Sequence, residues 1–244
     1  MQSDTKLLVN HDYTTSQIVA ERYGNTAQQC ARARSRHDSA VAVRFARSLS
    51  LHVMPSAPFT HATLIQALTA TEAEVAAFFE SLSADEFALR QGTAWSPAGH
   101  LAHLNISVSA TARGFSMPKL LLRFRFGRSR RPSRTLDQLT ADYLARLASG
   151  AGAKGRFVPA PDTVAGPPAD VQRALLSRWR RVNDRLRAAL MTWSERDLDR
   201  LQLPHPLLGR ITARELVFFT IYPGPHHIAA AKRRLPRFAA EDPA

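Results

Sequence analysis

The chain has 244 residues, of which 45% are hydrophobic, and a formal net charge of +13. This length suits one large or two small domains, and the apolar content is ample for a buried core. A single cysteine, Cys30, excludes an internal disulfide framework and a multi-cysteine metal cluster, and no stretch approaches the roughly eighteen apolar residues of a membrane span, so we expect a soluble, cytoplasmic protein without a transmembrane segment.

Residues 1–53 differ in character from the rest of the chain. They contain seven Lys or Arg and four Asp or Glu, with no sustained helical or strand period. Met54 is followed by two prolines and then by a well-patterned helix. We therefore expect residues 1–53 to be a disordered or mis-started extension, residues 54–238 to form the folded unit, and residues 239–244 to be a tail. A basic targeting arm is the alternative for the first segment.

Two amphipathic helices follow Met54. Apolar residues from Leu64 to Leu82 recur at steps of three and four, which predicts a helix over residues 61–82. A second helix is predicted to begin after Ser96, which can cap it, with Pro97 in its first turn. On that helix the spacing places His100, His103 and Ser107 on one face.

A strongly basic segment lies between Met117 and Leu136. It contains seven Lys or Arg and no acid, interleaved with leucines and phenylalanines. Such a mixture can bind phosphates and bases, or lie on an anionic bilayer. We favour a long inter-helix loop whose apolar residues tuck under the bundle while its arginines stay solvated, and we do not expect a nucleic-acid partner.

The next elements are a short helix, a loop and a long helix. A cap at Thr135 begins a helical piece to about Ala148, and the proline- and glycine-rich loop that follows leads to Asp170. Between Val171 and Trp193 apolar residues recur at steps of three and four, which is typical of a bundle helix. The connection over residues 204–209 is interpreted as rigid, and we expect no strand in the chain.

The terminal segment, residues 211–235, contains the strongest functional clue. Thr212 and Glu215 have the spacing of a capping box, and an apolar stripe follows them. Continued at helical spacing, that stripe turns His226 and His227 towards the core. Residues 223–225 read Pro-Gly-Pro, which removes helix hydrogen bonds, so we expect the helix to kink or restart there.

Four long helices joined by loops, two of them long, predict an all-α four-helix bundle. Three phrases in it are similar to the DinB-like superfamily of bacterial four-helix-bundle proteins: WSPAGHLAHL (residues 95–104), HPLLGRIT (residues 205–212) and FFTIYPGPHHI (residues 218–228). The resemblance extends from residue 59 to about residue 235.

The resemblance implies a metal site. Members of this family typically hold a divalent metal, often zinc or nickel, with one histidine of the second helix and an H-x-x-x-H pair on the last, and characterised members include thiol transferases and isomerases. The matching positions here are His103, Pro223 and His227. One of the three ligands is therefore replaced, and a divalent metal would be bound weakly or not at all.

Several functions stay open on the sequence alone. In the first, His100 or His226 replaces the lost ligand and the chain is a metal-dependent transferase or hydrolase of unknown substrate. In the second, the chain is a metal-free relative that binds a small molecule or forms a homodimer through helix faces. In the third, the basic segment binds nucleic acid or a membrane surface. Metal content separates the first two.

Overall fold

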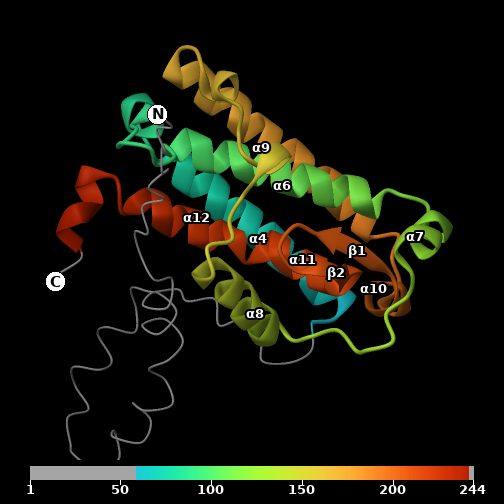
Figure 1. Cartoon of the computed structure of the whole chain (residues 1–244). Helices are drawn as coiled ribbons and strands as arrows, with labels where there is room; N and C mark the ends of the chain where they lie inside the picture. Colours follow the sequence, from blue (N-terminus) through green and yellow to red (C-terminus); the bar gives the residue numbers. More distant parts are fainter. Residues whose placement is uncertain (1–58, 242–244) are drawn as a thin grey trace, which may run out of the picture. The chain divides into compact units, whose positions relative to one another are not determined.

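The computed structural model describes residues 59–241, with no side-chain description for Asp162 and residues 239–241 (Figure 1). The expectations for residues 1–53 and for the beginning of the folded unit at residue 54 lie outside this range, as does the end of the tail. Residues 58–142 and 152–244 form one compact unit, and a second unit contains residues 143–151. The bundle and all four candidate histidines belong to the first unit.

Four helical segments build the bundle, which confirms the predicted all-α fold. They are α4 (His61–Glu80), α6 (Pro97–Phe115), α9 (Pro168–Leu190), and α11 (Ala213–Ile221) followed by α12 (Pro223–Lys232). α6 and α4 both pack against α9, and both also contact α11 and α12. Helices α11 and α12 run in line with one another along the bundle (Figure 1). Two faces of the bundle thus meet the terminal segment that contains His226 and His227.

Shorter elements connect the bundle helices. They are α5 (Ala84–Ala88), α7 (Lys119–Phe126), α8 (Leu136–Ala148), α10 (Glu195–Arg200), and the 3-10 turns η2 (Gly155–Phe157) and η3 (Pro161–Val164); a further 3-10 turn, η4 (Pro236–Glu241), follows α12. Within residues 59–241, none of the helices is both long enough and apolar enough to cross a membrane.

Local capping explains where the helices begin. The Ser96 hydroxyl accepts a hydrogen bond from the Gly99 amide at 3.2 Å, and Pro97 occupies the first turn of α6. Thr212 and Glu215 form the predicted capping box at the start of α11. Each cap satisfies amides that the first helical turn leaves unpaired. The caps therefore fix the registers in which α6 and α11 present their side chains.

The core follows the stripe predicted on α9. Leu175, Trp179, Val182, Leu186 and Leu190 are all buried. The indole N–H of Trp179 donates to the Glu72 carbonyl of α4 at 3.0 Å, so this large side chain is buried without an unsatisfied polar atom. Apolar burial at this seam holds α9 against α4 and supports α6 beside it.

The expectation that the chain contains no strand is wrong. Two short strands, β1 (Gln202–His205) and β2 (Gly209–Thr212), pair antiparallel, with His205 opposite Gly209. The His205 ring accepts the amides of Leu207 and Leu208 through Nδ1, both at 3.3 Å, which closes the turn. Gly209 supplies the positive φ of 69° that ends it. The rigid connection predicted here is a β-hairpin that leads directly into α11.

The Pro-Gly-Pro sequence restarts the terminal helix, as the sequence predicts. Tyr222 keeps right-handed helical angles, and Pro223 is the first residue of α12. Gly224 lies so close to α4 that an added Cβ would be 2.8 Å from Thr71 Cγ2 and 3.0 Å from Val75 Cγ2. The absence of a side chain at Gly224 therefore allows α12 to approach α4 closely.

The basic segment is folded differently from the predicted loop. It contains the helix α7, on which Leu122 is buried while Leu120, Leu121 and Phe124 are exposed. Two of its arginines, Arg131 and Arg134, bind the buried carboxylate of Glu215 and are not simply solvated. The segment is thus attached to the bundle by charge as well as by apolar contact.

Candidate functional site

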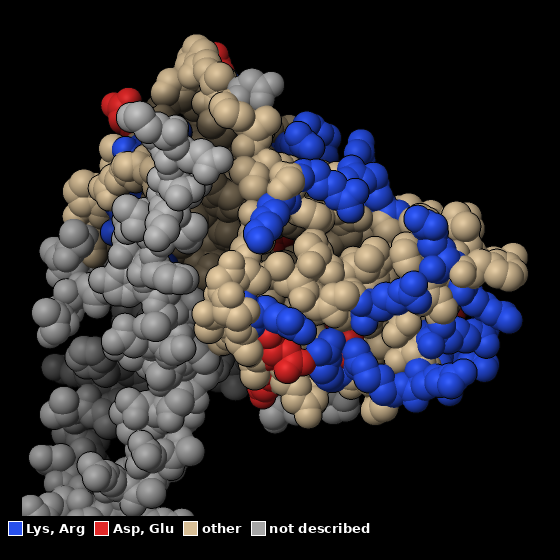
Figure 2. Space-filling view, in the orientation of Figure 1, with Lys and Arg blue, Asp and Glu red and all other residues tan. Residues whose placement is uncertain are grey.

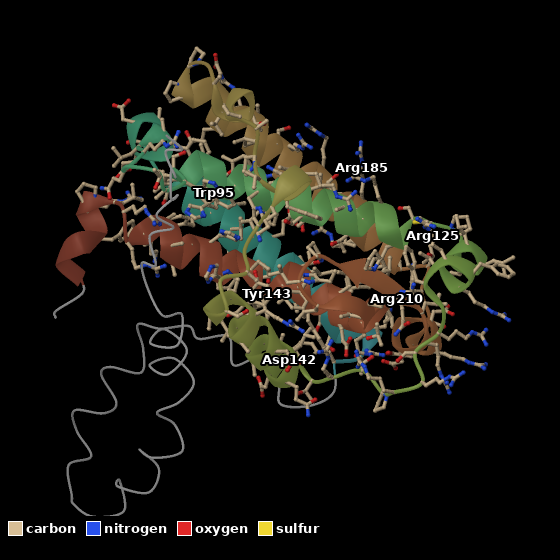
Figure 3. All side chains as sticks on the ribbon, in the orientation of Figure 1. Trp95, Arg125, Asp142, Tyr143, Arg185 and Arg210 are labelled. Carbon is tan, nitrogen blue, oxygen red and sulfur yellow. The ribbon has the colours of Figure 1, made fainter. Side chains whose placement is uncertain are left out.

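Three of the four candidate histidines form a cluster between α6 and α12. The His227 ring centroid lies 5.1 Å from that of His100 and 4.9 Å from that of His103. Trp95 lies in the loop before α6 (Figure 3). It contacts all three rings, with its centroid 5.0 Å from that of His103. We call His100, His103, His227 and Trp95 the histidine cluster.

His100 and His227 bind one another directly. Their Nδ1 atoms are 2.9 Å apart, and the two side chains are buried, with residue exposures of 6% and 8%. One ring must donate its Nδ1–H and the other must accept it. The Nε2 atom of His100 is buried and has no hydrogen-bond partner. A buried polar atom without a partner is costly, so this nitrogen is a place where a polar ligand or water gains a hydrogen bond.

His103 is oriented by a backbone carbonyl. Its Nδ1 lies 2.7 Å from the Phe157 oxygen in η2, and since a carbonyl only accepts, Nδ1 must be the protonated nitrogen. Its Nε2 is therefore the unprotonated nitrogen, which has a lone pair. The Ser107 hydroxyl can donate to that nitrogen only weakly, since Oγ lies 3.4 Å from Nε2, which is long for a hydrogen bond. The contact with η2 thus leaves one nitrogen of His103 able to act as an acceptor or ligand.

His226 lies at the edge of the cluster. Its ring contacts that of His227 edge-on at 5.3 Å between centroids, and the residue is only partly buried. Adjacent residues on a helix point about 100° apart, so His226 and His227 cannot both face the same partner on α6.

The environment keeps these imidazoles neutral. Burial lowers the pKa of His100 to about 3, with a further contribution from Arg234. Burial also lowers the pKa of His227 well below its ordinary value, and that of His103 and His226 to a smaller extent. Neutral imidazoles have lone pairs for hydrogen bonds or metal ions, but they are poor proton donors at neutral pH.

The cluster does not match a three-histidine metal centre. Among the residues that the structure describes, no three His, Cys, Asp or Glu side chains are arranged to hold one ion. Two ligands of a tetrahedral zinc at about 2.0–2.1 Å would be about 3.3 Å apart, whereas the His100 and His227 nitrogens are at hydrogen-bond distance. A six-coordinate ion would accept the shorter spacing but would need further ligands. Pro223 supplies none.

A second buried polar cluster surrounds Glu215, whose side chain has 0% exposure. Arg131 Nη2 donates to its carboxylate at 2.8 Å, Arg134 Nε at 3.0 Å, and the Arg134 and Thr212 amides at 2.8 and 2.9 Å. Burial alone would raise the pKa of Glu215, but the hydrogen bonds from Arg131 and Arg134 lower it to about 2. The sequence indicates only a capping role for Glu215. The one signal of its second role is the run of arginines without an acid, which could donate to a buried carboxylate elsewhere in the chain.

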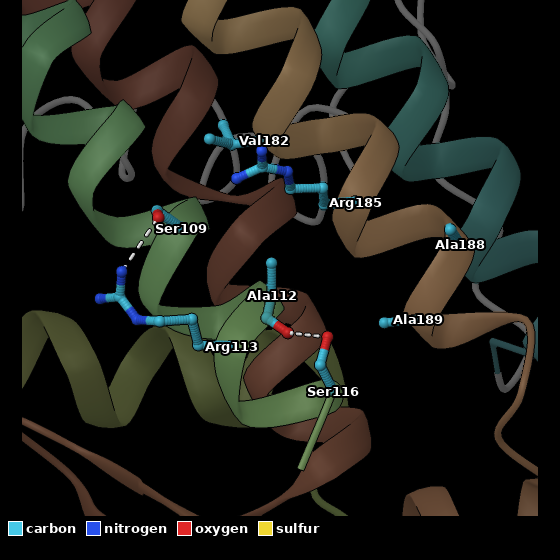
Figure 4. Close-up of a pocket in the computed structure, with 8 residues that line it drawn as sticks. All are labelled: Ser109, Ala112, Arg113, Ser116, Val182, Arg185, Ala188 and Ala189. Atoms are coloured by element: carbon cyan, nitrogen blue, oxygen red, sulfur yellow. Dashed lines mark hydrogen bonds between the residues drawn. The ribbon is translucent and has the colours of Figure 1, made fainter.

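Two surface hollows lie elsewhere. One, of about 380 Å³, lies between α6 and α9, where Arg113 donates to Ser109 at 3.2 Å and Arg185 lies on the opposite helix (Figure 4). The other, of about 450 Å³, adjoins η3 and the beginning of α9. Neither is lined by any of the four histidines. Their walls combine alanines with surface arginines and contain no converging buried polar groups, so the histidine cluster is the better candidate site.

Comparison with known proteins agrees with the fold. The family model described as the DinB superfamily matches residues 67–231, a range that includes all four histidines. No curated protein matches the chain, and no solved structure matches it. The family match covers most of the bundle and leaves the substrate open.

Proposed function

We propose, since the chain belongs to the DinB superfamily, that its histidine cluster is a small-molecule site in which the usual metal of that superfamily is bound weakly. The observation that carries the proposal is the direct bond between His100 and His227. It occupies one nitrogen of each ring, while Pro223 stands at the position of a third ligand.

The residues of the cluster have separable roles in such a site. His103, fixed by the Phe157 carbonyl, offers the lone pair of Nε2 to a donor group of the ligand. His100 offers its unpartnered Nε2, as donor or acceptor according to which way the bond to His227 runs. Trp95 covers the rings with an apolar surface. A small molecule with one or two polar groups fits this set of contacts.

A metal-dependent transferase or hydrolase is the second candidate. The specific observation in its favour is the unpartnered Nε2 of His100, which stands beside His103 and His227 and could take the place of the lost ligand. The two candidates predict different metal contents.

Elemental analysis of protein purified without a histidine tag tests the proposal. We expect well under one equivalent of zinc or nickel, and we expect Pro223→His to bind zinc more tightly in calorimetric titration, because it restores the H-x-x-x-H spacing with His227. His61→Gln, outside the cluster, is the matched control. A full equivalent that is lost in His100→Ala would instead establish the second candidate.

Trp95 provides a readout of ligand entry. Glutathione and cysteine, the probes suggested by the thiol-using relatives, are titrated with and without EDTA while tryptophan fluorescence is followed. We expect an EDTA-independent change that is absent in Trp95→Phe, since Trp179 and Trp193 are buried in the core. A response that disappears with EDTA would contradict a metal-free site.

A further inference from the structure

The helix α7 exposes an apolar surface with no partner in the described part of the chain. Leu120, Leu121 and Phe124 have exposures of 61%, 47% and 78%. At about 100° per residue these three side chains fall within one arc of the helix, and Leu122 and Phe126 face the other way, towards the core. Grouping on one arc distinguishes this surface from isolated exposed apolar residues, which are common.

Arginines border that surface on both sides. By the same helical spacing, Arg123 and Arg125 flank the apolar arc, and Arg128 and Arg130 follow directly after α7. All four are exposed, and none has an ion-pair partner among residues 59–241. The space-filling view shows blue side chains around the tan tip at this end of the molecule (Figure 2). Arg210 joins them through a hydrogen bond to the Phe126 carbonyl (Figure 3).

The three carboxylates of α10, the helix whose last residue Arg200 accepts from the Ser129 amide, pair with other cations and not with those arginines. Asp197 is paired with Lys119 at 2.7 Å, and Asp199 and Glu195 are both paired with Arg214. The positive charge at this end is therefore uncompensated. Such a field attracts anionic partners and repels cationic ones.

α7 is held in place by the structure around it. The Lys119 ammonium donates to the Thr192 carbonyl at 2.7 Å, and the Ser129 amide donates to the Arg200 carbonyl at 2.8 Å. Leu122 has 0% exposure. The exposed leucines and phenylalanine are thus presented outward on a fixed support.

We propose that this surface, α7 with Arg128, Arg130 and Arg210, docks on an anionic phospholipid bilayer, with Leu120, Leu121 and Phe124 inserted at the lipid interface. An amphipathic element of leucine and phenylalanine flanked by arginines has the chemistry of interfacial binding. A second copy of the chain fits worse, because a symmetric contact would bring two unpaired arginine rims together. Nucleic acid fits worse as well, because leucines cannot stack on bases.

Vesicle co-sedimentation of the full chain tests the proposal. We expect binding to vesicles of 70% phosphatidylcholine and 30% phosphatidylglycerol, no binding to phosphatidylcholine alone, and weakening at 0.5 M salt. Leu120→Ser with Phe124→Ser should lower the partition coefficient about tenfold or more. Arg123→Gln with Arg125→Gln should lower it about 25-fold, at roughly fivefold for each arginine.

Matched control variants distinguish binding through the α7 surface from binding that any positive charge on the chain would cause. Arg178→Gln with Arg181→Gln removes the same charge from exposed positions on α9, and Val158→Ser removes an exposed apolar residue elsewhere, so both should leave the coefficient within about twofold. Circular dichroism and the thermal midpoint check that each variant is folded. Any of four results would overturn the proposal: no binding, binding unaffected by the α7 variants, a loss confined to the arginine variant, or tighter binding of duplex DNA through the same residues.

Discussion

Two buried polar clusters of the same compact unit differ in how fully their hydrogen bonds are satisfied. The carboxylate of Glu215 accepts from two arginine side chains and two backbone amides, and its side chain is completely buried. In the histidine cluster, His100 is nearly as buried but retains a nitrogen without a partner. The hydrogen bonding of the Glu215 carboxylate is complete, whereas the histidine cluster can take one more hydrogen-bonding group.

The difference separates a structural role from a ligand-binding one. A fully satisfied buried network fixes the elements that meet in it, here the basic segment and the first turn of α11. A partly satisfied one costs stability unless something else completes it. We therefore expect the Glu215 cluster to determine stability and the histidine cluster to determine binding.

The largest loss of stability should come from neutralising Glu215. Glu215→Gln removes the charge that Arg131 and Arg134 bind, and leaves both guanidiniums without their buried partner. We expect a loss of about 3 kcal/mol in the free energy of unfolding, measured by urea denaturation. Glu74→Gln, at an exposed position of α4, is the control. A loss below about 1 kcal/mol would mean that Glu215 contributes no more to stability than an exposed ion pair does.

Buried histidines and Glu215 should also affect the free energy of unfolding in different pH ranges. Burial lowers the pKa of His100 to about 3 and of His205 to about 4, so below the ordinary value of 6.5 the unfolded chain binds more protons than the folded chain. Stability therefore falls as the pH drops from about 6.5, by up to about 1.4 kcal/mol per pH unit for each buried histidine. Chemical denaturation at pH 7, 6 and 5 measures this slope, and His205→Asn should reduce it.

Glu215 contributes in a lower range. Its folded pKa of about 2 lies below its unfolded value near 4.5, so its contribution is complete above pH 4.5 and is lost as the pH falls towards 2. A flat profile from pH 6.5 to 5 would contradict the assignment of neutral buried histidines. A loss that begins only below pH 4.5 would assign all acid sensitivity to carboxylates.

The smallest effect should come from His226. It is partly buried at the edge of the cluster, where its ring packs edge-on against that of its neighbour His227. His226→Gln should change the free energy of unfolding by less than about 0.5 kcal/mol and leave zinc affinity within twofold. A loss of zinc binding in this variant would mean that His226 is itself a metal ligand.

Local patterns in the sequence predicted the parts of the fold that local physics controls. The Ser96 cap, the capping box at Thr212, the stripe on α9 and the restart at Pro223 depend on residues a few positions apart. The β-hairpin was missed because two prolines and a histidine hide the alternation of a strand in so short a segment. α7 was missed because only two turns separate Pro118 from Gly127.

The site was only partly predictable. Helical spacing and family resemblance indicated the four histidines, but not which nitrogens they use. The contact between His103 and the Phe157 carbonyl joins residues 54 apart through the backbone, which leaves no mark on side-chain patterns. The binding of Arg131 and Arg134 to Glu215 likewise depends on how the segment folds back. Such long-range pairings require the three-dimensional arrangement.

The close approach at Gly224 limits which residues an engineer could replace to rebuild a metal centre. Any side chain there would push α12 away from Thr71 and Val75, and would shift His227, which lies on α12, from its present position against His100. A variant that begins by replacing the whole Pro-Gly-Pro turn with ordinary helix formers would therefore lose the geometry it needs. The workable route keeps the glycine and changes only Pro223, to histidine, and Pro225.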